Sequence, residues 1–194
     1  MNSYNTNWKS VISEDIKRWA KFCREPLTKK FVIKTFLGCE EFRRLIHYRI
    51  QHTPLRILRP ITKLLSDKIN LYIWTKEIGP GFKIEHGFST IILANRIGKN
   101  FTIFQQVTIG WGGKTDDDGN HAATIGDDVT VHPGAKIFGG VHIGNDVEIG
   151  ANSVVLHDVP DHCIVAGVPA KIIKRRSSRN EPWQKVENTM VTVF

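Results

Sequence analysis

The chain of 194 residues is 41% hydrophobic and 24% charged, which fits one compact domain with a small appendage and excludes wholesale disorder. It has no apolar run of about 18 residues, and Met1–Asn5 lack the basic-then-apolar order of a secretory signal, so we expect neither a transmembrane segment nor export. The three cysteines, Cys23, Cys39 and Cys163, are too widely spaced for a disulfide framework or a CxxC metal pair. We therefore predict a cytoplasmic protein.

The net charge of +8 is concentrated in the first part of the chain. Residues 1–70 hold 15 Lys and Arg against 6 Asp and Glu, whereas residues 71–194 hold 12 against 13. Charge of this kind is compatible with nucleic-acid binding, but no zinc-finger, RNA-recognition or helix-turn-helix motif accompanies it. We expect no nucleic-acid partner and interpret the basic residues as the solvated faces of helices.

Residues 1–70 are predicted to form a basic α-helical N-terminal subdomain. A helix is expected from Ser13, with Ile16 and Trp19 among its apolar positions, and Glu25–Pro26 should end it. Residues 28–52 have the pattern of a second helix. A third, short helical piece is expected within residues 53–65, where two prolines interrupt the pattern.

The rest of the chain contains an internal repeat of six residues. Aliphatic residues recur at this spacing in three registered blocks, which are Ile78 and Ile84, then Ile91, Ile97, Ile103 and Ile109, then Ile125, Val131, Ile137, Ile143, Ile149 and Val155. Neither an α-helix nor a single strand gives a period of six, whereas a parallel β-helix does. We predict such a domain over residues 71–173, followed by a C-terminal tail over 174–194.

Two breaks in the period mark candidate functional segments. The spacing from Ile84 to Ile91 is seven, directly after Glu85-His86-Gly87, which places a histidine at the edge of a coil. The spacing from Ile109 to Ile125 is sixteen. Its excess, residues 111–123, is polar and Gly-rich and carries His121, so we predict a projecting loop there.

Five runs in the second part of the chain resemble the hexapeptide-repeat acyltransferases, most closely their serine acetyltransferase branch. These are IGPGFKIEHG (78–87), FQQVTIG (104–110), IGDDVTVHPGAKIFGGVHIG (125–144), IGANSVVLHDVP (149–160) and VAGVPAKII (165–173). The resemblance implies a mainly β fold, a left-handed parallel β-helix with the N-terminal α-helical subdomain beside it. It also implies a homotrimer that uses acetyl-CoA as co-substrate and needs no metal.

The resemblance assigns roles to residues at both breaks in the period. His86 falls on the family's catalytic histidine, a general base that takes the proton of the acceptor hydroxyl. His121 falls on a second catalytic position in the loop. Glu85 and Asn120, which precede these histidines, occupy substrate-binding positions.

The same resemblance implies a path for the CoA moiety. Residues expected along it are Gly112, Gly113 and Lys114 in the loop, Pro133, Gly134 and Ala151 on the coils, and Lys171 and Lys174 after the GVPA run. His132 lies beside this path and is interpreted as a residue that lines a coil. The alternative for the basic residues after the GVPA run is an ordinary solvated tail with no role in CoA binding.

Departures from the family pattern concern the acceptor. Glu85 stands where serine acetyltransferases have Asp, and Asn120 where they have the Arg that pairs with the serine carboxylate. The stretch Leu71–Trp74 lacks the Asp that orients the catalytic histidine. We therefore favour acetylation of a saccharide hydroxyl, as in capsule, exopolysaccharide or lipopolysaccharide biosynthesis. The alternative is a serine O-acetyltransferase of cysteine biosynthesis.

Two other classes of protein remain open at this point. One is a non-catalytic hexapeptide protein. The other is a zinc-dependent hydrolase of the carbonic anhydrase kind, for which His86, His121 and His132 would supply three ligands. The motifs around these histidines match the acetyltransferases better, so we expect no metal site.

Overall fold

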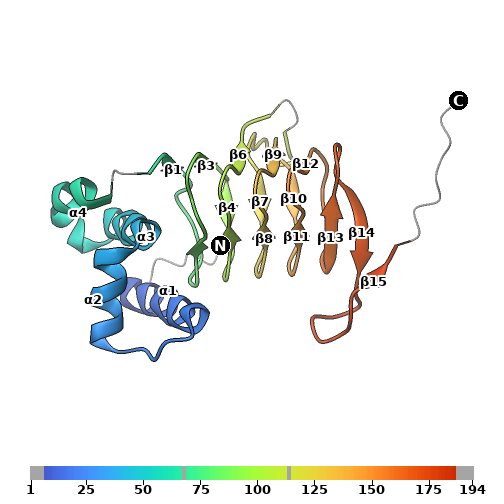
Figure 1. Ribbon diagram of the computed structural model, residues 1–194. Coiled ribbons are helices and arrows are strands. Elements are labelled where there is room, and N and C mark those ends of the chain that lie inside the picture. Colours follow the sequence, from blue (N-terminus) through green and yellow to red (C-terminus); the bar gives the residue numbers. More distant parts are fainter. Residues whose placement is uncertain (1–6, 67–68, 113–114, 187–194) are drawn as a thin grey trace, which may run out of the picture.

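The computed structural model describes residues 7–66, 69–112 and 115–186, and joins a group of helices to a column of stacked strands (Figure 1). The helices come first in the chain, and they are α1 (Trp8–Cys23), α2 (Lys29–Gly38), α3 (Glu40–Gln51), the 3-10 helix η2 (Pro54–Leu58) and α4 (Arg59–Ser66). None of the described helices is both long enough and apolar enough to cross a membrane.

The helices differ from the predicted ones at their ends. α1 begins at Trp8 rather than at Ser13, because the Asn7 side chain accepts a hydrogen bond from Ser10 N and caps the helix there. The single helix predicted over residues 28–52 is two helices. Cys39 has an extended backbone between them, with φ −118° and ψ 116°, and the acidic residues Glu40 and Glu41 start α3.

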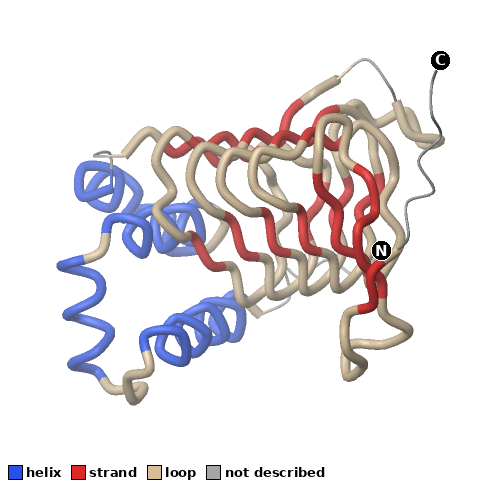
Figure 2. Tube along the Cα trace, turned by 45° about the vertical axis from the view of Figure 1, so that its right-hand side comes forward, coloured by secondary structure: helices blue, strands red, loops and turns tan. Residues whose placement is uncertain are grey.

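The strands form three parallel sheets, one along each side of a coiled column (Figure 2). Sheet A contains β1 (Leu71–Ile73), β3 (Thr90–Ile92), β6 (Thr108–Gly110), β9 (Lys136–Phe138) and β12 (Val154–Val155). Sheet B contains β4 (Arg96–Ile97), β7 (Thr124–Ile125) and β10 (His142–Ile143). Sheet C contains β2 (Lys83–Ile84), β5 (Thr102–Ile103), β8 (Thr130–Val131), β11 (Glu148–Ile149) and β13 (Cys163–Ala166). From β3 to β12 the chain visits the sheets in the repeating order A, B, C, and this confirms the predicted parallel β-helix.

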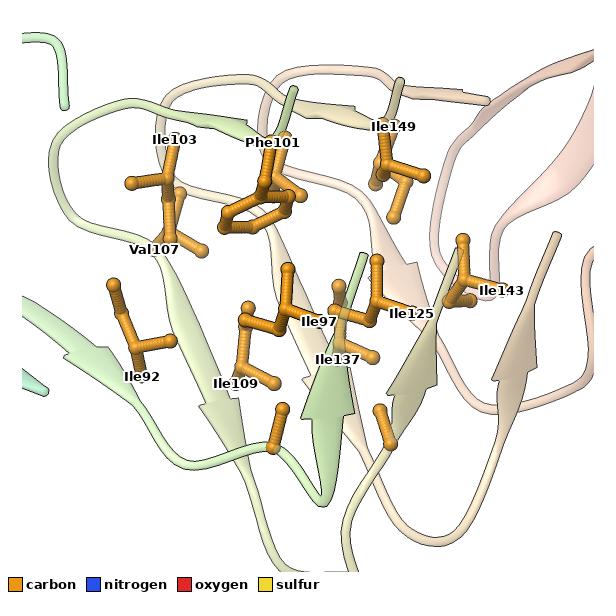
Figure 3. Packing of buried hydrophobic residues seen from close by; sticks show 14 of the residues in the cluster. Ile92, Ile97, Phe101, Ile103, Val107, Ile109, Ile125, Ile137, Ile143 and Ile149 are labelled. Atoms are coloured by element: carbon orange, nitrogen blue, oxygen red, sulfur yellow. The ribbon is translucent and has the colours of Figure 1, made fainter. Parts of the chain in front are cut away.

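The residues of the six-residue repeat fill the interior of the column. On sheet B, Ile97, Ile125 and Ile143 pair in register, and each is at most 3% exposed. Figure 3 shows their side chains converging with those from the other two sheets. Each buried aliphatic side chain contributes about 1.5–3 kcal/mol, so the repeat that defines the sequence also supplies the core.

The C-terminal segment, which was predicted to be a tail, contains strands. Two antiparallel strands, β14 (Lys171–Arg175) and β15 (Gln184–Lys185), extend sheet C beyond the last coil. Arg176 binds Asp146 on the fourth coil, and His162 Nδ1 lies 2.7 Å from the same carboxylate. Residues 174–185 are thereby attached to the column.

A buried ion pair joins the helices to the first coil. Asp15 on α1 is fully buried and accepts hydrogen bonds from Gly81 N at 2.7 Å, Phe82 N at 2.8 Å and Arg49 Nε at 2.7 Å. Arg49 on α3 also donates to the carbonyl of Gly79 at 2.7 Å. The expectation that the basic residues of this segment are simply solvated is wrong here, because Arg49 is committed to the backbone of the β-helix.

Candidate active site

The turns between sheet C and sheet A form one edge of the column, called the C–A edge below. It carries His86 after β2, Gln105 after β5, Pro133 and Gly134 after β8, and Ala151 after β11. Backbone hydrogen bonds connect successive turns, from Gly134 N to Gln105 O at 3.0 Å and from Asn152 N to Pro133 O at 2.9 Å. Since coils are spaced by about 4.8 Å, His86 and Ala151 lie about 14 Å apart along this edge.

His86 is the accessible histidine of the C–A edge. Its backbone is left-handed, with φ 50°, in a turn closed by a 2.6 Å hydrogen bond from Phe88 N to the His86 carbonyl. Its side chain is exposed and has no hydrogen bond or ion pair with any other described residue. His132, on the same edge, instead stacks on Phe104 with ring centroids 5.4 Å apart. The ring available to an incoming substrate is therefore that of His86.

The carboxylate next to His86 is already engaged. Glu85, predicted to bind substrate, forms an ion pair with Lys83, whose ammonium lies under the Phe22 ring of α1. The Lys83 side chain is 7% exposed, and burial lowers its pKa while Glu85 opposes that shift. Glu85 is therefore next to His86 in the sequence, but its carboxylate binds the buried Lys83 ammonium.

The predicted loop lies on a different edge, in the turn from β6 in sheet A to β7 in sheet B, called the A–B edge below. His121 is exposed in this loop, and its carbonyl accepts a 3.4 Å hydrogen bond from Gly112 N across the loop base. Gly113 and Lys114, expected along the CoA path, lie outside the described residues.

Asn120 shapes the loop. Its backbone and side-chain nitrogens both donate to the Asp116 carboxylate, at 2.7 and 2.8 Å. These hydrogen bonds, led by that of the Asn120 side chain, hold the pKa of Asp116 below its ordinary value. The loop then packs closely on the next coil, where a Cβ on Gly140 would come within 2.2 Å of the Asn120 carbonyl oxygen. The Asn120 amide is thus used within the loop.

The basic residues expected near the CoA phosphates lie on the strands that extend sheet C. Lys171 is exposed and pairs in register with Ala166, while Lys174 lies opposite Ile164 on one side and Lys185 on the other. Within residues 7–66, 69–112 and 115–186, no group of three or more His, Cys, Asp or Glu side chains is arranged to hold a metal ion.

One polar residue of the C–A edge was missed by sequence reasoning. Gln105 Oε1 is shielded from solvent and has no hydrogen-bond partner among the described residues. A buried acceptor left unpaired costs about 1–3 kcal/mol, and such groups call for an explanation in a native structure. The signal was present in the sequence, since Gln105 belongs to the FQQVTIG run, one coil beyond His86.

The two candidate histidines are separated within one chain. His86 precedes a strand of sheet A and His121 follows one, so the full width of that sheet lies between the two edges. Six residues of extended chain span roughly 15–20 Å, which is too far for both rings to contact one small acceptor.

Comparison with known proteins identifies the family. The family model described as "Bacterial transferase hexapeptide (six repeats)" matches residues 122–157. The serine acetyltransferase of Bacillus subtilis is 33% identical over 178 residues, covering 87% of this chain and 79% of that protein. The serine acetyltransferase of Bacillus pumilus is 42% identical over 178 residues, with the same coverage. This chain belongs to the hexapeptide-repeat acyltransferases, in the serine acetyltransferase-like branch.

Solved structures of that branch have the same fold. The serine acetyltransferase of Brucella abortus superposes with a TM-score of 0.66 at 26% identity, covering 87% of this chain and 69% of that one. A serine acetyltransferase in complex with CoA gives 0.61 at 25% identity, covering 84% and 69%. The column of coils is therefore a left-handed parallel β-helix, as the resemblance implied, and the protein is an enzyme of the acyltransferase class.

Proposed function

We propose that this protein transfers the acetyl group of acetyl-CoA to the hydroxyl of L-serine, with His86 as general base. The observation that carries the proposal is the exposed, unpaired His86 ring on the C–A edge of a chain whose relatives are named serine acetyltransferases. His86 takes the hydroxyl proton as the oxygen attacks the thioester carbonyl. The new C–O bond forms, the C–S bond breaks, and His86 returns the proton to the departing sulfur.

The acyl donor is placed along the C–A edge. Pro133, Gly134 and Ala151 continue this edge from His86, and their turns would line an extended arm. Lys171 and Lys174 would meet the CoA phosphates at its far end. Gln105 Oε1, a buried acceptor without a partner on the same edge, would take a hydrogen bond from an N–H group of donor or acceptor.

A second copy of the chain would complete the site. Because His86 and His121 lie on different edges, we place the His121 loop of one subunit against the C–A edge of its neighbour, with Gly112, Gly113 and Lys114 on the same loop. A head-to-tail contact of this kind closes into a ring, and a homotrimer suits a column with three sides. The unpaired thiols of Cys23, Cys39 and Cys163 fit a reducing cytoplasm.

Replacing His86 tests the chemistry. His86→Ala should retain the fold and acetyl-CoA binding but lose about 10²–10⁴-fold in kcat, because the general base is absent. His157→Ala is the matched control, since His157 is an exposed histidine on the last coil, and it should be unchanged. Unaltered kcat in His86→Ala would remove this residue from the mechanism.

Mixing two inactive variants tests the shared site. In randomly mixed trimers of His86→Ala and His121→Ala chains, about a quarter of the sites pair an intact His86 with a neighbour's intact His121. Activity should therefore return to about a quarter of the wild-type value. A mixture as inactive as its two components would contradict a site made by two subunits.

A saccharide hydroxyl is the second candidate acceptor, and one observation favours it. The position of the carboxylate-binding Arg is Asn120, whose amide is bound to Asp116 rather than free to meet an anion. Sugar hydroxyls carry no charge and both donate and accept hydrogen bonds, so they need no fixed cation. The two acceptors are distinguished by supplying each as the only hydroxyl compound in the assay.

A further inference from the structure

The helices expose an unusual number of apolar side chains at one end of the molecule. Of sixteen large apolar side chains exposed in the described residues, ten lie within 7–66, and the most exposed of these ten are Leu37, Ile57 and Leu64, at 72%, 83% and 80%. Single exposed apolar residues need no explanation, whereas a cluster marks an interaction site. Together α2, η2 and α4 carry eight of the ten, and α2 and α4 lie at the end of the molecule farthest from β13 and β14 (Figure 1).

α4 turns its apolar side outward. Of its side chains that the structure describes, only Thr62 is buried, and its hydroxyl lies 2.8 Å from Nδ1 of His47 on α3. Ile61, Leu64 and Leu65 are exposed. A helix of a soluble domain normally buries its apolar stripe, so this inverted arrangement indicates a surface that is covered by something else.

The ends of α2 and α4 are linked through one residue of α3. Arg43 on α3 donates to the carbonyls of Phe36 and Leu37 at the end of α2, at 3.1 and 2.8 Å, and to that of Leu65 at the end of α4, at 2.8 Å. One guanidinium thus holds both helix ends side by side. We call the five most exposed apolar side chains of α2, η2 and α4 the outer helical face, and its members are Ile33, Leu37, Ile57, Ile61 and Leu64.

The segments that carry this face are basic, and the neighbouring carboxylate of Glu40 pairs with Arg43. Residues 26–39 and 51–66, which contain it, carry Lys and Arg at six positions and no Asp or Glu. Lys34 pairs with Glu25 at the margin of the face. A second copy of the chain docked here would bring like charges together. An anionic surface with an apolar interior complements both the basic charge and the exposed apolar side chains of this face.

We propose that the outer helical face docks on the surface of a lipid bilayer that contains anionic phospholipids. Its apolar side chains would enter the boundary between headgroups and acyl chains, while Arg56 and Arg59 contact phosphates. The column of coils then projects away from the bilayer, and both candidate edges of the active site stay open. This docking does not depend on which hydroxyl is acetylated.

Vesicle flotation with the full chain tests the proposal. The protein should float with vesicles of phosphatidylcholine and phosphatidylglycerol, bind much less to phosphatidylcholine alone, and be released by salt. Arg56→Gln and Arg59→Gln should each weaken binding about fivefold, from the usual attraction of a basic residue to an anionic leaflet. Ile57→Ser and Leu64→Ser should each weaken it roughly tenfold or more.

Matched controls come from the other end of the molecule. Lys185→Gln and Leu156→Ser change an exposed basic and an exposed apolar residue on the β-helix domain, and both should float as wild type does. All variants should keep wild-type activity in solution, which verifies folding. The proposal is overturned if the wild type does not float, or if Ile57→Ser and Leu64→Ser float normally but change the oligomeric state in sedimentation.

Discussion

Asp15→Ala is the most informative test of how the helices hold the β-helix domain. The substitution removes a fully buried carboxylate that accepts hydrogen bonds from Gly81 N, Phe82 N and Arg49. Burial raises the pKa of Asp15 while Arg49 opposes that shift, so the two side chains depend on each other. Arg49 is 7% exposed in the wild type, and the variant leaves its guanidinium without a carboxylate partner.

Breaking a buried pair by removing one partner costs about 3–5 kcal/mol. For a chain of this size each kcal/mol lowers Tm by about 2–4 °C, so we expect Tm to fall by about 6–20 °C. Thermal unfolding followed by circular dichroism measures this shift. Glu14→Ala is the control, because Glu14 makes only an exposed ion pair with Lys17, and it should change stability by less than about 1 kcal/mol. Equal Tm values for the two variants would refute a structural role for the Asp15–Arg49 pair.

Three further predictions concern the column of coils. Gly126→Ala should destabilise by several kcal/mol in denaturant unfolding, because its Cβ would lie 2.8 Å from the Gly144 backbone, whereas Gly38→Ala, with no atom within 4 Å, should not. Asp146 has its pKa held below the ordinary value by Arg176 and His162, although burial raises it, so its stabilisation should be present near neutral pH. That stabilisation should be lost as the pH falls below about 3.8, and the difference in unfolding free energy between wild type and Asp146→Asn should shrink there. Gln105→Leu should raise stability while lowering kcat/KM, since it removes an unpaired buried acceptor on the C–A edge.

The column could be predicted from the sequence because a six-residue period fits a parallel β-helix and few other folds. One aliphatic residue in every six must point to a common axis, and the structure buries those residues in register. The spacing of sixteen after Ile109 also located the loop, because a coil cannot absorb ten extra residues. These features depend on local spacing alone, so no knowledge of distant contacts was needed.

The relation between His86 and His121 follows from the spacing of the repeat. Every third repeat returns to the same sheet, and Ile84 lies on sheet C whereas Ile109 lies on sheet A. The residues that follow them must therefore leave from different edges. Counting repeats in threes places the two histidines on different edges of one chain.

Other features depend on contacts between segments far apart in the chain. The spacing of Asp15 from Trp19 places it on the apolar side of α1, but its partners are 34 to 67 residues away and cannot be identified from that spacing. Likewise, an amphipathic period shows that α4 has an apolar side but not which side packs on α3. The Thr62 hydroxyl lies 2.8 Å from His47 Nδ1, so the Thr62 side of α4 packs on α3 and Leu64 and Leu65 are exposed.

The acceptor assay tests the central claim most directly. Thiol release from acetyl-CoA is measured with L-serine as the only hydroxyl compound, for the wild type and for His86→Ala. We expect serine-dependent release by the wild type, with O-acetyl-L-serine identified by mass spectrometry, and a loss of about 10²–10⁴-fold in the variant. Release no faster with L-serine than without it, together with acetylation of an added saccharide, would contradict the serine assignment.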